Sequence, residues 1–292
     1  MSERVLVGDI GGTNSRWAIF DGTLGPVSVT KTRDAHSLGQ AAHQFLQGRD
    51  VQACCVAVAG PVENGKAVLT NADWVADPGA MGVPTRILND LEGAAYGVGL
   101  LEQHDVHWPL GVSPHVGDTL VLGVGTGFGG AVIQDGQVTP LEPGHEIFVP
   151  ADGGDLDGLV LEGTTVEHLV SGPGLLRIVR HFGSKYPAPP DIPDANVSDW
   201  LLLNAETDPL AQVACHAFRQ AFIDASVALA DRWGAGRILY MGGVVEGWTE
   251  HLTRAGAWEE IGSRTGCHLG VVRHPYPGLL GAGRVGQSLI PS

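Results

Sequence analysis

A glycine-rich turn between two short apolar runs occurs twice in this chain, and it constrains the fold more than any other feature. The first copy is GDIGGTNSRWAIFD at residues 8–21, and the second is LGVGTGFGGAVI at residues 122–133. Turn residues flanked by apolar runs predict β-hairpins. Strand and helix patterns alternate after each hairpin, which is typical of α/β folds. We therefore predict two lobes, each a mixed β-sheet flanked by helices, with a ligand cleft between them.

The composition agrees with a chain that makes many close backbone approaches. Glycine accounts for 43 of 292 residues, against roughly 20 at average usage, and it follows no Gly-X-Y period. The formal charge of −15 disfavours nucleic acid and anionic membranes as partners. Phosphate can still bind locally, through backbone N–H groups and Mg²⁺.

No apolar run predicts export or membrane insertion. The N-terminal MSERVLVGD has too few apolar residues for a signal peptide or a spanning helix, and no run elsewhere reaches about 18. The four cysteines show neither a C-x-x-C pair nor metal-ligand spacing, and we interpret them as buried thiols of a reducing compartment: Cys54, Cys55, Cys215 and Cys267. We expect a cytoplasmic protein.

Local patterns predict the elements of each lobe. We expect strands at 4–9, 15–21, 26–32, 53–59, 86–89, 119–123, 131–134, 137–139, 237–241 and 269–272. Helices are expected at 37–46, from a cap at Asp90 to about 101, at 208–233 and at 279–289. The connection 103–117 shows little periodicity. We expect a small lobe of residues 1–101, joined by the C-terminal helix at about 277–292, and a large lobe of residues 102–276.

The first turn suits a phosphate group. Gly11 and Gly12 let the backbone approach a ligand closely, and successive N–H groups through Thr13 and Asn14 can form an anion-binding nest. Asp9 stands just before the turn, where it can hold Mg²⁺, usually through water. The alternative is a plain hairpin turn, for which Asn and Gly are common. An acidic residue before a double glycine favours phosphate binding.

The second turn fits G-x-G-x-x-G at Gly125, Gly127 and Gly130. A dinucleotide-binding site needs a helix after this motif, and here a strand pattern follows instead. A second phosphate hairpin, with a hydroxyl from Thr126, agrees better with that context. The segment Gly60–Lys66 resembles part of a P-loop, but it lacks the Ser or Thr that holds Mg²⁺, so we interpret it as a turn between strands.

Three polar groups suit a polyol substrate. Asn89-Asp90 ends a predicted strand, so Asp90 can accept a proton from a hydroxyl; the alternative is a simple helix cap. Glu142 and His145 lie three residues apart across a Pro-Gly turn, where each can orient hydroxyls. Glu167 precedes the helix start SGPG and is a further carboxylate. For Glu142, His145 and Glu167 the alternative is solvated polar side chains at the surface. We do not expect zinc at Glu142 and His145, because no third ligand lies nearby.

A late glycine pair, Gly242-Gly243, follows the predicted strand 237–241 and precedes a predicted helix. Glycines at this place can let a flat base lie on the backbone. The alternative is an ordinary turn between a strand and a helix.

These segments occur in the order and approximate spacing of the bacterial glucokinases, which the chain resembles from Gly8 to PGLLGAGR at residues 277–284. The resemblance implies the two-lobed fold of the actin–hexokinase superfamily, ATP and Mg²⁺ as cofactors, and a homodimer. It implies that Asp90 takes the proton of the glucose 6-hydroxyl. It implies sugar contacts from Asn89, Glu142, His145 and Glu167; a first phosphate and Mg²⁺ site at Asp9, Gly11, Gly12, Thr13 and Asn14; a second at Gly125, Thr126 and Gly127; and an adenosine site at Gly242 and Gly243.

Two departures from related families separate the alternatives. Pro143 replaces a glycine that the family often carries, which stiffens the turn before His145. The cysteine-rich zinc motif of the related repressor and sugar kinase family is missing, and no helix-turn-helix segment precedes Gly8, so we disfavour a transcription factor. The remaining alternatives are a kinase for mannose, glucosamine or an N-acetylhexosamine, a polyphosphate-using glucokinase, a catalytically silent sugar sensor, and a chaperone-like or filament-forming ATPase.

Overall fold

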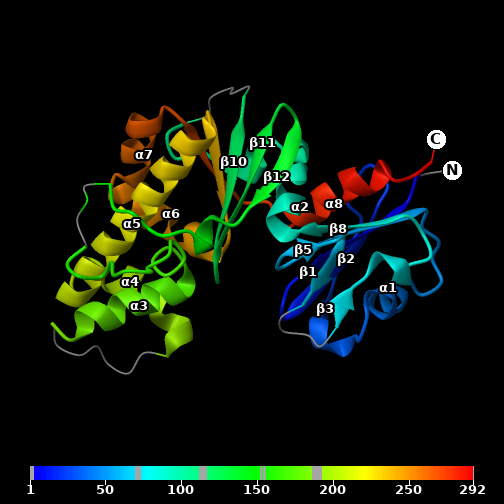
Figure 1. Ribbon diagram of the computed structural model, residues 1–292, viewed down its shortest axis with the longest axis horizontal. Helices are drawn as coiled ribbons and strands as arrows, with labels where there is room; N and C mark the ends of the chain where they lie inside the picture. The colour runs from blue at the N-terminus through cyan, green and yellow to red at the C-terminus, as the bar shows by residue number, and fades with distance from the viewer. Residues whose placement is uncertain are drawn as a thin grey trace. The chain divides into compact units, whose positions relative to one another are not determined.

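A computed structural model of the chain describes residues 3–69, 74–111, 117–151, 153, 156–185 and 193–291. The chain forms two units, each with a β-sheet and helices (Figure 1). Unit 1 comprises Met1–Gln103, Val138–Pro140 and His274–Ser292, and unit 2 comprises His104–Gln137 and Leu141–Arg273. The predicted α/β class is therefore confirmed.

The two large sheets repeat one strand order. In unit 1 the order is β3 (Ser28–Lys31), β2 (Asn14–Phe20), β1 (Val5–Ile10), β4 (Ala53–Val58) and β8 (Thr85–Asn89). The second sheet runs β12 (Gln137–Leu141), β11 (Phe128–Gln134), β10 (Thr119–Val124), β13 (Arg237–Met241), β14 (His268–Val272) and β9 (Val106–His107). It belongs to unit 2 except for Val138–Pro140 of β12, which fall in unit 1. In each sheet, an antiparallel meander is followed by two parallel strands. The duplication predicted from the two glycine turns is thus present in the topology.

Register brings the predicted motifs of each unit to one sheet edge. In unit 1, Ile10 is level with Val58, and Val58 is level with Asn89. Because adjacent strands lie about 4.8 Å apart, the ends of β1 and β8 are separated by roughly 10 Å. In unit 2, Gly123 is level with Met241. The second glycine turn and Gly242 therefore leave neighbouring strands at the same edge.

Helices cover both faces of the unit 1 sheet. They are α1 (Leu38–Leu46), α2 (Asp90–Gly97) and α8 (Pro277–Gln287), with short 3₁₀ turns at Thr32–Asp34, Pro78–Ala80 and Val98–Leu100. Leu6 of β1 belongs to the core cluster that includes Leu38 of α1, whereas Val7 belongs to the cluster that includes Leu279 of α8. Figure 1 shows α8, in red, beside α2.

Unit 2 is organised around one long buried helix, α5 (Pro209–Trp233). The other helices are α3 (Gly172–Gly183), α4 (Val197–Asn204), α6 (Gly243–Arg254) and α7 (Ala257–Thr265), with 3₁₀ turns at Gln103–Asp105, Pro143–His145 and Asp194–Asn196. Phe222 of α5 contacts the rings of Tyr240 and Trp258 at centroid distances of 5.1 and 5.6 Å. These contacts form part of a single core cluster.

Several elements differ from the sequence prediction. The helices α4 and α7, the edge strand β9 and a small sheet of β5 (Val62–Glu63), β6 (Lys66–Val68) and β7 (Val75–Ala76) were not predicted. The helix that starts at Asp90 ends at Gly97 and continues as a 3₁₀ turn through Leu100. Residues 112–116 of the aperiodic connection lie outside the described residues. The segment Gly60–Lys66 does form a turn between strands, with positive φ at Asn64 and Gly65.

Within the described ranges, no helix has the length and apolar character to cross a membrane.

Candidate active site

The first glycine turn joins β1 to β2 and is fixed from both sides. The Gly11 N–H donates to the Asn14 carbonyl (3.0 Å), and the Thr13 carbonyl accepts from the Thr32 N–H (3.0 Å). The Thr32 hydroxyl donates to the Gly11 carbonyl (2.7 Å). Neither Gly11 nor Gly12 has a positive φ, so these glycines are not needed for a left-handed backbone. The Gly11 N–H is used inside the turn, which removes one donor from the predicted anion nest.

Asp9 lies beside this turn, opposite Arg16 in the β1–β2 register. The Arg16 guanidinium contacts the Asp9 carboxylate at 3.2 Å. Burial raises the pKa of Asp9, and the charge and hydrogen bond of Arg16 oppose that shift. A Cβ added at Gly278 would lie 3.9 Å from the Asp9 carboxyl carbon. The first turn of α8 therefore lies next to this carboxylate. The described residues contain no cluster of three metal-ligating side chains. One carboxylate fits Mg²⁺, which keeps several of its waters.

Asn89 caps α2, and the expectation that Asp90 is the cap is wrong. The Asn89 side-chain oxygen accepts from the N–H groups of Leu91 (2.9 Å) and Glu92 (3.3 Å), while Glu92 accepts from the Asn89 N–H (3.3 Å). This capping box forms because Asn89 has an extended backbone that directs its side chain at the first turn. The Asn89 amide also donates to the Gly60 carbonyl (3.0 Å), which leaves one amide proton for a ligand.

Asp90 is consequently the first residue of the helix. Its side chain is half-buried and accepts a hydrogen bond from the Leu91 N–H at 2.9 Å. A carboxylate at a helix N-terminus is stabilised in its charged form by the helix dipole. The charged form is the one that can accept a proton.

The second glycine turn lies beside the first residues of two 12-residue helices. The Gly125 N–H donates to the Gly127 carbonyl (3.0 Å), and the Gly125 carbonyl accepts from the Gly172 N–H at the start of α3 (2.8 Å). Gly242, the cap of α6, has φ +105°, and a Cβ there would lie 2.6 Å from the Val124 carbonyl oxygen. Only glycine fits this position. Helix N-termini attract anions, so this edge of unit 2 suits phosphate.

Gly125 and Gly243 leave open space at this edge, because a Cβ on either would meet no atom within 4 Å. The Gly242 N–H, by contrast, donates to the Glu246 carboxylate at 3.3 Å. The open backbone at Gly125 and Gly243 is therefore the part of the edge that a nucleotide can approach. Thr126 is exposed at the tip of the turn.

Two of the predicted sugar-binding side chains meet next to this turn. The His145 ring nitrogen Nε2 lies 3.8 Å from the Glu167 carboxylate, and the two side chains are 70% and 33% exposed. A Cβ on Gly127 would lie 3.3 Å from Glu167 Oε2, and one on Gly144 would lie 3.2 Å from it. Glu142 precedes the same 3₁₀ turn, where its carbonyl accepts from the His145 N–H (3.2 Å).

Pro143 suits the place where it departs from the family pattern. It is buried at the first position of the 3₁₀ turn, where a missing N–H removes no hydrogen bond. A Cβ on Gly130 would lie 3.4 Å from its ring, and a Cβ on Gly144 would overlap the Phe128 carbonyl oxygen. The Pro-Gly pair therefore packs against β11 and sets the backbone that carries His145.

Two charged residues that contact the candidate site residues or their segment were not predicted from the sequence. Asp224 on α5 is 2% exposed and accepts from the Ala151 N–H, in the segment between His145 and Glu167. Its signal in the sequence is a lone carboxylate inside the apolar run AFIDASVALA. Arg16, the partner of Asp9, was missed as well, and it is recognisable only once the hairpin register is known.

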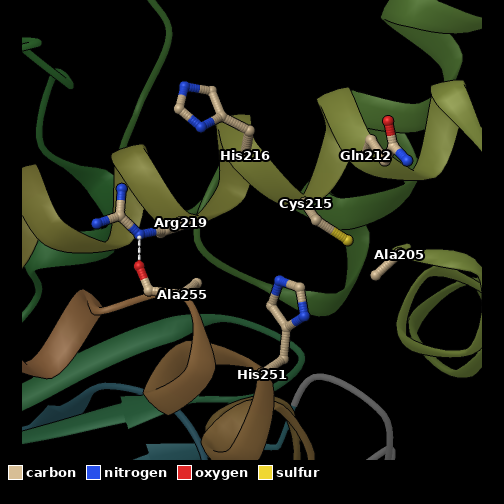
Figure 2. A pocket seen from close by; sticks show the side chains of 7 residues that line it. All are labelled: Ala205, Gln212, Cys215, His216, Arg219, His251 and Ala255. Carbon is tan, nitrogen blue, oxygen red and sulfur yellow. Dashed lines mark hydrogen bonds between the residues drawn. The ribbon is translucent and has the colours of Figure 1, made fainter.

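A hollow of about 410 Å³ lies elsewhere in unit 2, at α5 and α6 (Figure 2). Arg219 at its wall donates to the Ala255 carbonyl (2.8 Å) and pairs with Glu260 (2.7 Å), so protein groups already balance its charge. Burial lowers the pKa of His251, which also lines it. None of the predicted site residues lines this hollow, and we do not assign the active site to it.

Comparison with known sequences gives a family match across the chain. Residues 6–288 match the sequence profile of the family described as Glucokinase. The chain is 36% identical to the glucokinase of Caulobacter sp. (strain K31), in a match that spans 58% of this chain and 59% of that one. It is 30% identical to the glucokinase of Xanthomonas oryzae pv. oryzae (strain MAFF 311018), over 96% of this chain and 94% of that one.

Solved structures share the fold. A glucokinase from an Antarctic psychrotroph superimposes with a TM-score of 0.83 at 22% identity, covering 99% of this chain and 100% of that one. A ROK family glucokinase from Streptomyces griseus, solved in complex with glucose and AMPPNP, gives 0.65 at 21% identity, covering 98% and 99%. The predicted actin/hexokinase-like fold is thereby confirmed.

Proposed function

The chain belongs to the glucokinase family, and from that premise we propose that it transfers the terminal phosphoryl group of ATP to the 6-hydroxyl of glucose. The observation that carries this proposal is the grouping of His145 and Glu167 beside the second glycine turn. A polar pair of the kind that orients hydroxyls lies next to backbone that suits phosphate. The Streptomyces griseus relative, which binds glucose and AMPPNP, supports the same pair of ligands.

Asp90 is the base in the proposed mechanism. It orients the sugar 6-hydroxyl and accepts its proton as the phosphoryl group is transferred. It stands in the first turn of α2, where the helix dipole favours a negative charge. Asn89, Glu142, His145 and Glu167 bind the other sugar hydroxyls, and Asn89 does so with the side-chain amide proton that is not donated to the Gly60 carbonyl.

The glycine turns bind the nucleotide. We assign the first phosphate site to Asp9 and the turn Gly11–Asn14, the second to Gly125, Thr126 and Gly127, and the adenosine to Gly242 and Gly243. Open backbone at Gly125 and Gly243 supports the last two assignments. Mg²⁺, held by Asp9 through water, would offset the phosphate charge.

An assay of ADP release with Mg·ATP tests the function. Glucose, mannose, fructose, glucosamine and N-acetylglucosamine are compared, and we expect selective turnover of glucose. Preference for another sugar would make the chain a kinase of that sugar. ATP binding without turnover of any sugar would indicate a sensor, and turnover with polyphosphate alone would change the donor.

Asp90→Asn tests the base directly. We expect kcat to fall by about 10²–10⁴-fold, because the amide cannot accept the proton, while glucose affinity measured by calorimetry stays close to that of the parent protein. Asp21→Asn, at an exposed turn of the same unit, is the control and should retain full activity. Near-normal turnover by Asp90→Asn would refute the assignment.

The remaining proposals follow from the resemblance. We propose that activity depends on Mg²⁺; titration with EDTA, followed by addition of Mg²⁺ or Ca²⁺, tests this. We also propose a homodimer, which light scattering tests. A cytoplasmic location agrees with the four cysteines, all of which are free and buried.

A further inference from the structure

One continuous segment carries both His145 and Glu167, and we call Gly144–Glu167 the sugar segment. Its two ends pair with each other. The Glu167 N–H donates to the Gly144 carbonyl (3.1 Å), the Val166 N–H to the Glu146 carbonyl (3.0 Å), and the Phe148 N–H to the Thr164 carbonyl (2.9 Å). The spacing of His145 and Glu167 therefore depends on how the described residues 144–151 and 164–167 are held.

Two charged residues of helix α5 contact the sugar segment. Arg232 pairs with Glu146 near the surface. Asp224, eight residues earlier, is 2% exposed, and its Oδ2 accepts from the Ala151 N–H at 3.2 Å. Its Oδ1 accepts from Gln220 (3.1 Å) and from Arg264 of α7 (3.2 Å).

Stability alone does not account for Asp224. A buried ion pair costs desolvation energy, and apolar residues of similar size usually serve a core at least as well. The residues directly before and after Asp224 on α5, Ile223 and Ala225, are apolar and buried. Arg264 is in turn 3.6 Å from Glu260, which pairs with Arg219 at 2.7 Å. The carboxylate is thus held in one orientation, with one oxygen directed at the Ala151 N–H.

We propose that Asp224 is a positioning residue for the sugar site: it fixes the sugar segment through Ala151, and so sets the distance between His145 and Glu167. This inference rests on the proposed function of those two residues. It assigns Asp224 no contact with the substrate.

Two substitutions break the contact from opposite sides. The two oxygens of Asp224 accept hydrogen bonds from Ala151 and from Arg264. In Asp224→Asn only one of the two atoms is still an acceptor, so one of these hydrogen bonds is lost. Ala151→Pro deletes the N–H itself. Ala151 follows Pro150 in a turn closed by the Gly153 N–H and the Pro150 carbonyl (3.1 Å), a position that proline favours. The second variant leaves α5 unchanged, so it remains informative if Asp224→Asn folds poorly.

The matched control is Glu260→Gln. It removes a carboxylate from the same ionic network but leaves the contact to the sugar segment in place. We expect both test variants to raise KM for glucose about tenfold, the effect of losing one hydrogen bond to a charged group. KM for ATP should stay within about twofold, and the control should change neither constant.

Hydrogen exchange gives a readout that does not depend on turnover. Amides of residues 144–151 and 164–167 should exchange faster in both test variants than in the parent protein or in Glu260→Gln. Unchanged exchange there, or an equal rise of KM for glucose in the control, would overturn the positioning role. A parent protein that fails to phosphorylate glucose would refute the proposed function instead, and the exchange result would still decide whether Asp224 fixes the segment.

Discussion

At the scale of single residues, burial and Arg16 act in opposite directions on the charge of Asp9. Burial raises the pKa of Asp9 and the Arg16 ion pair lowers it. An acid with a raised pKa binds its proton more tightly in the folded state. Its contribution to stability is therefore present at low pH and is lost as the pH rises through the folded-state pKa. Binding Mg²⁺ requires the opposite, charged form.

Arg16→Gln should consequently raise the pKa of Asp9 further. We expect KM for Mg·ATP to increase on acidification in the parent protein, and the increase to begin at a higher pH in Arg16→Gln. KM measured between pH 5 and 8 checks this, with Arg33→Gln, an exposed arginine of the same unit, as control. Parallel pH profiles for Arg16→Gln and the parent would mean that Arg16 does not act through Asp9.

At the scale of elements, the contact between α2 and α8 positions Asp90, the proposed base. The two helices touch backbone to backbone, since a Cβ on Gly281 would overlap the Gly93 carbonyl oxygen and one on Gly97 would overlap the Pro277 carbonyl oxygen. Helix α2 begins at Asp90. Any displacement of α2 along this contact therefore moves the base.

Gly281→Ala should separate the two helices. We expect the free energy of unfolding to fall by about 1–3 kcal/mol, as for other overpacked cores, and kcat to fall with it because Asp90 is displaced. Urea denaturation and steady-state assays measure the two effects. Gly247→Ala on α6 is the control, because a Cβ there meets no atom within 4 Å; it should be neutral or stabilising by up to about 1 kcal/mol. A Gly281→Ala protein as stable and active as the parent would contradict the close contact.

Elements with a clear period or a strong turn could be predicted from sequence, and contacts that depend on packing could not. Both glycine hairpins and the parallel strands after them were predictable because apolar runs and turn residues mark them. Gly93, Gly97 and Gly281 resemble turn residues in the sequence, and only the packed helices explain them. The choice of Asn89 over Asp90 as the cap depends on a one-residue boundary, which local propensity does not resolve.

The candidate site follows the same division. Each polar motif was recognisable by residue type, but the approach of His145 to Glu167 comes from hydrogen bonds between the ends of the sugar segment. The contact of Asp224 could not be predicted, because its partner, Ala151, is 73 residues away and contributes only a backbone N–H.

At the scale of the whole molecule, the described core clusters of the two units draw on different parts of the chain. Unit 1 needs both ends of the chain, since α8 supplies Leu279 to a cluster that contains Val5 and Val7 of β1. The core cluster of unit 2 is drawn from residues 120–271 and from no part of unit 1. Because no described core cluster draws members from both units, we expect each unit to lose its structure separately.

Matched core truncations test that independence. Leu279 and Leu175 are both fully buried, the first in unit 1 and the second in α3 of unit 2. Each Leu→Ala change should cost about 2–5 kcal/mol through lost contacts and a cavity, but in different places. We expect Leu279→Ala to speed hydrogen exchange in β1, β4 and β8 and to spare β10 and β13, and Leu175→Ala to do the reverse. Equal loss of protection in both sheets from either change would show that the two units unfold as one cooperative body.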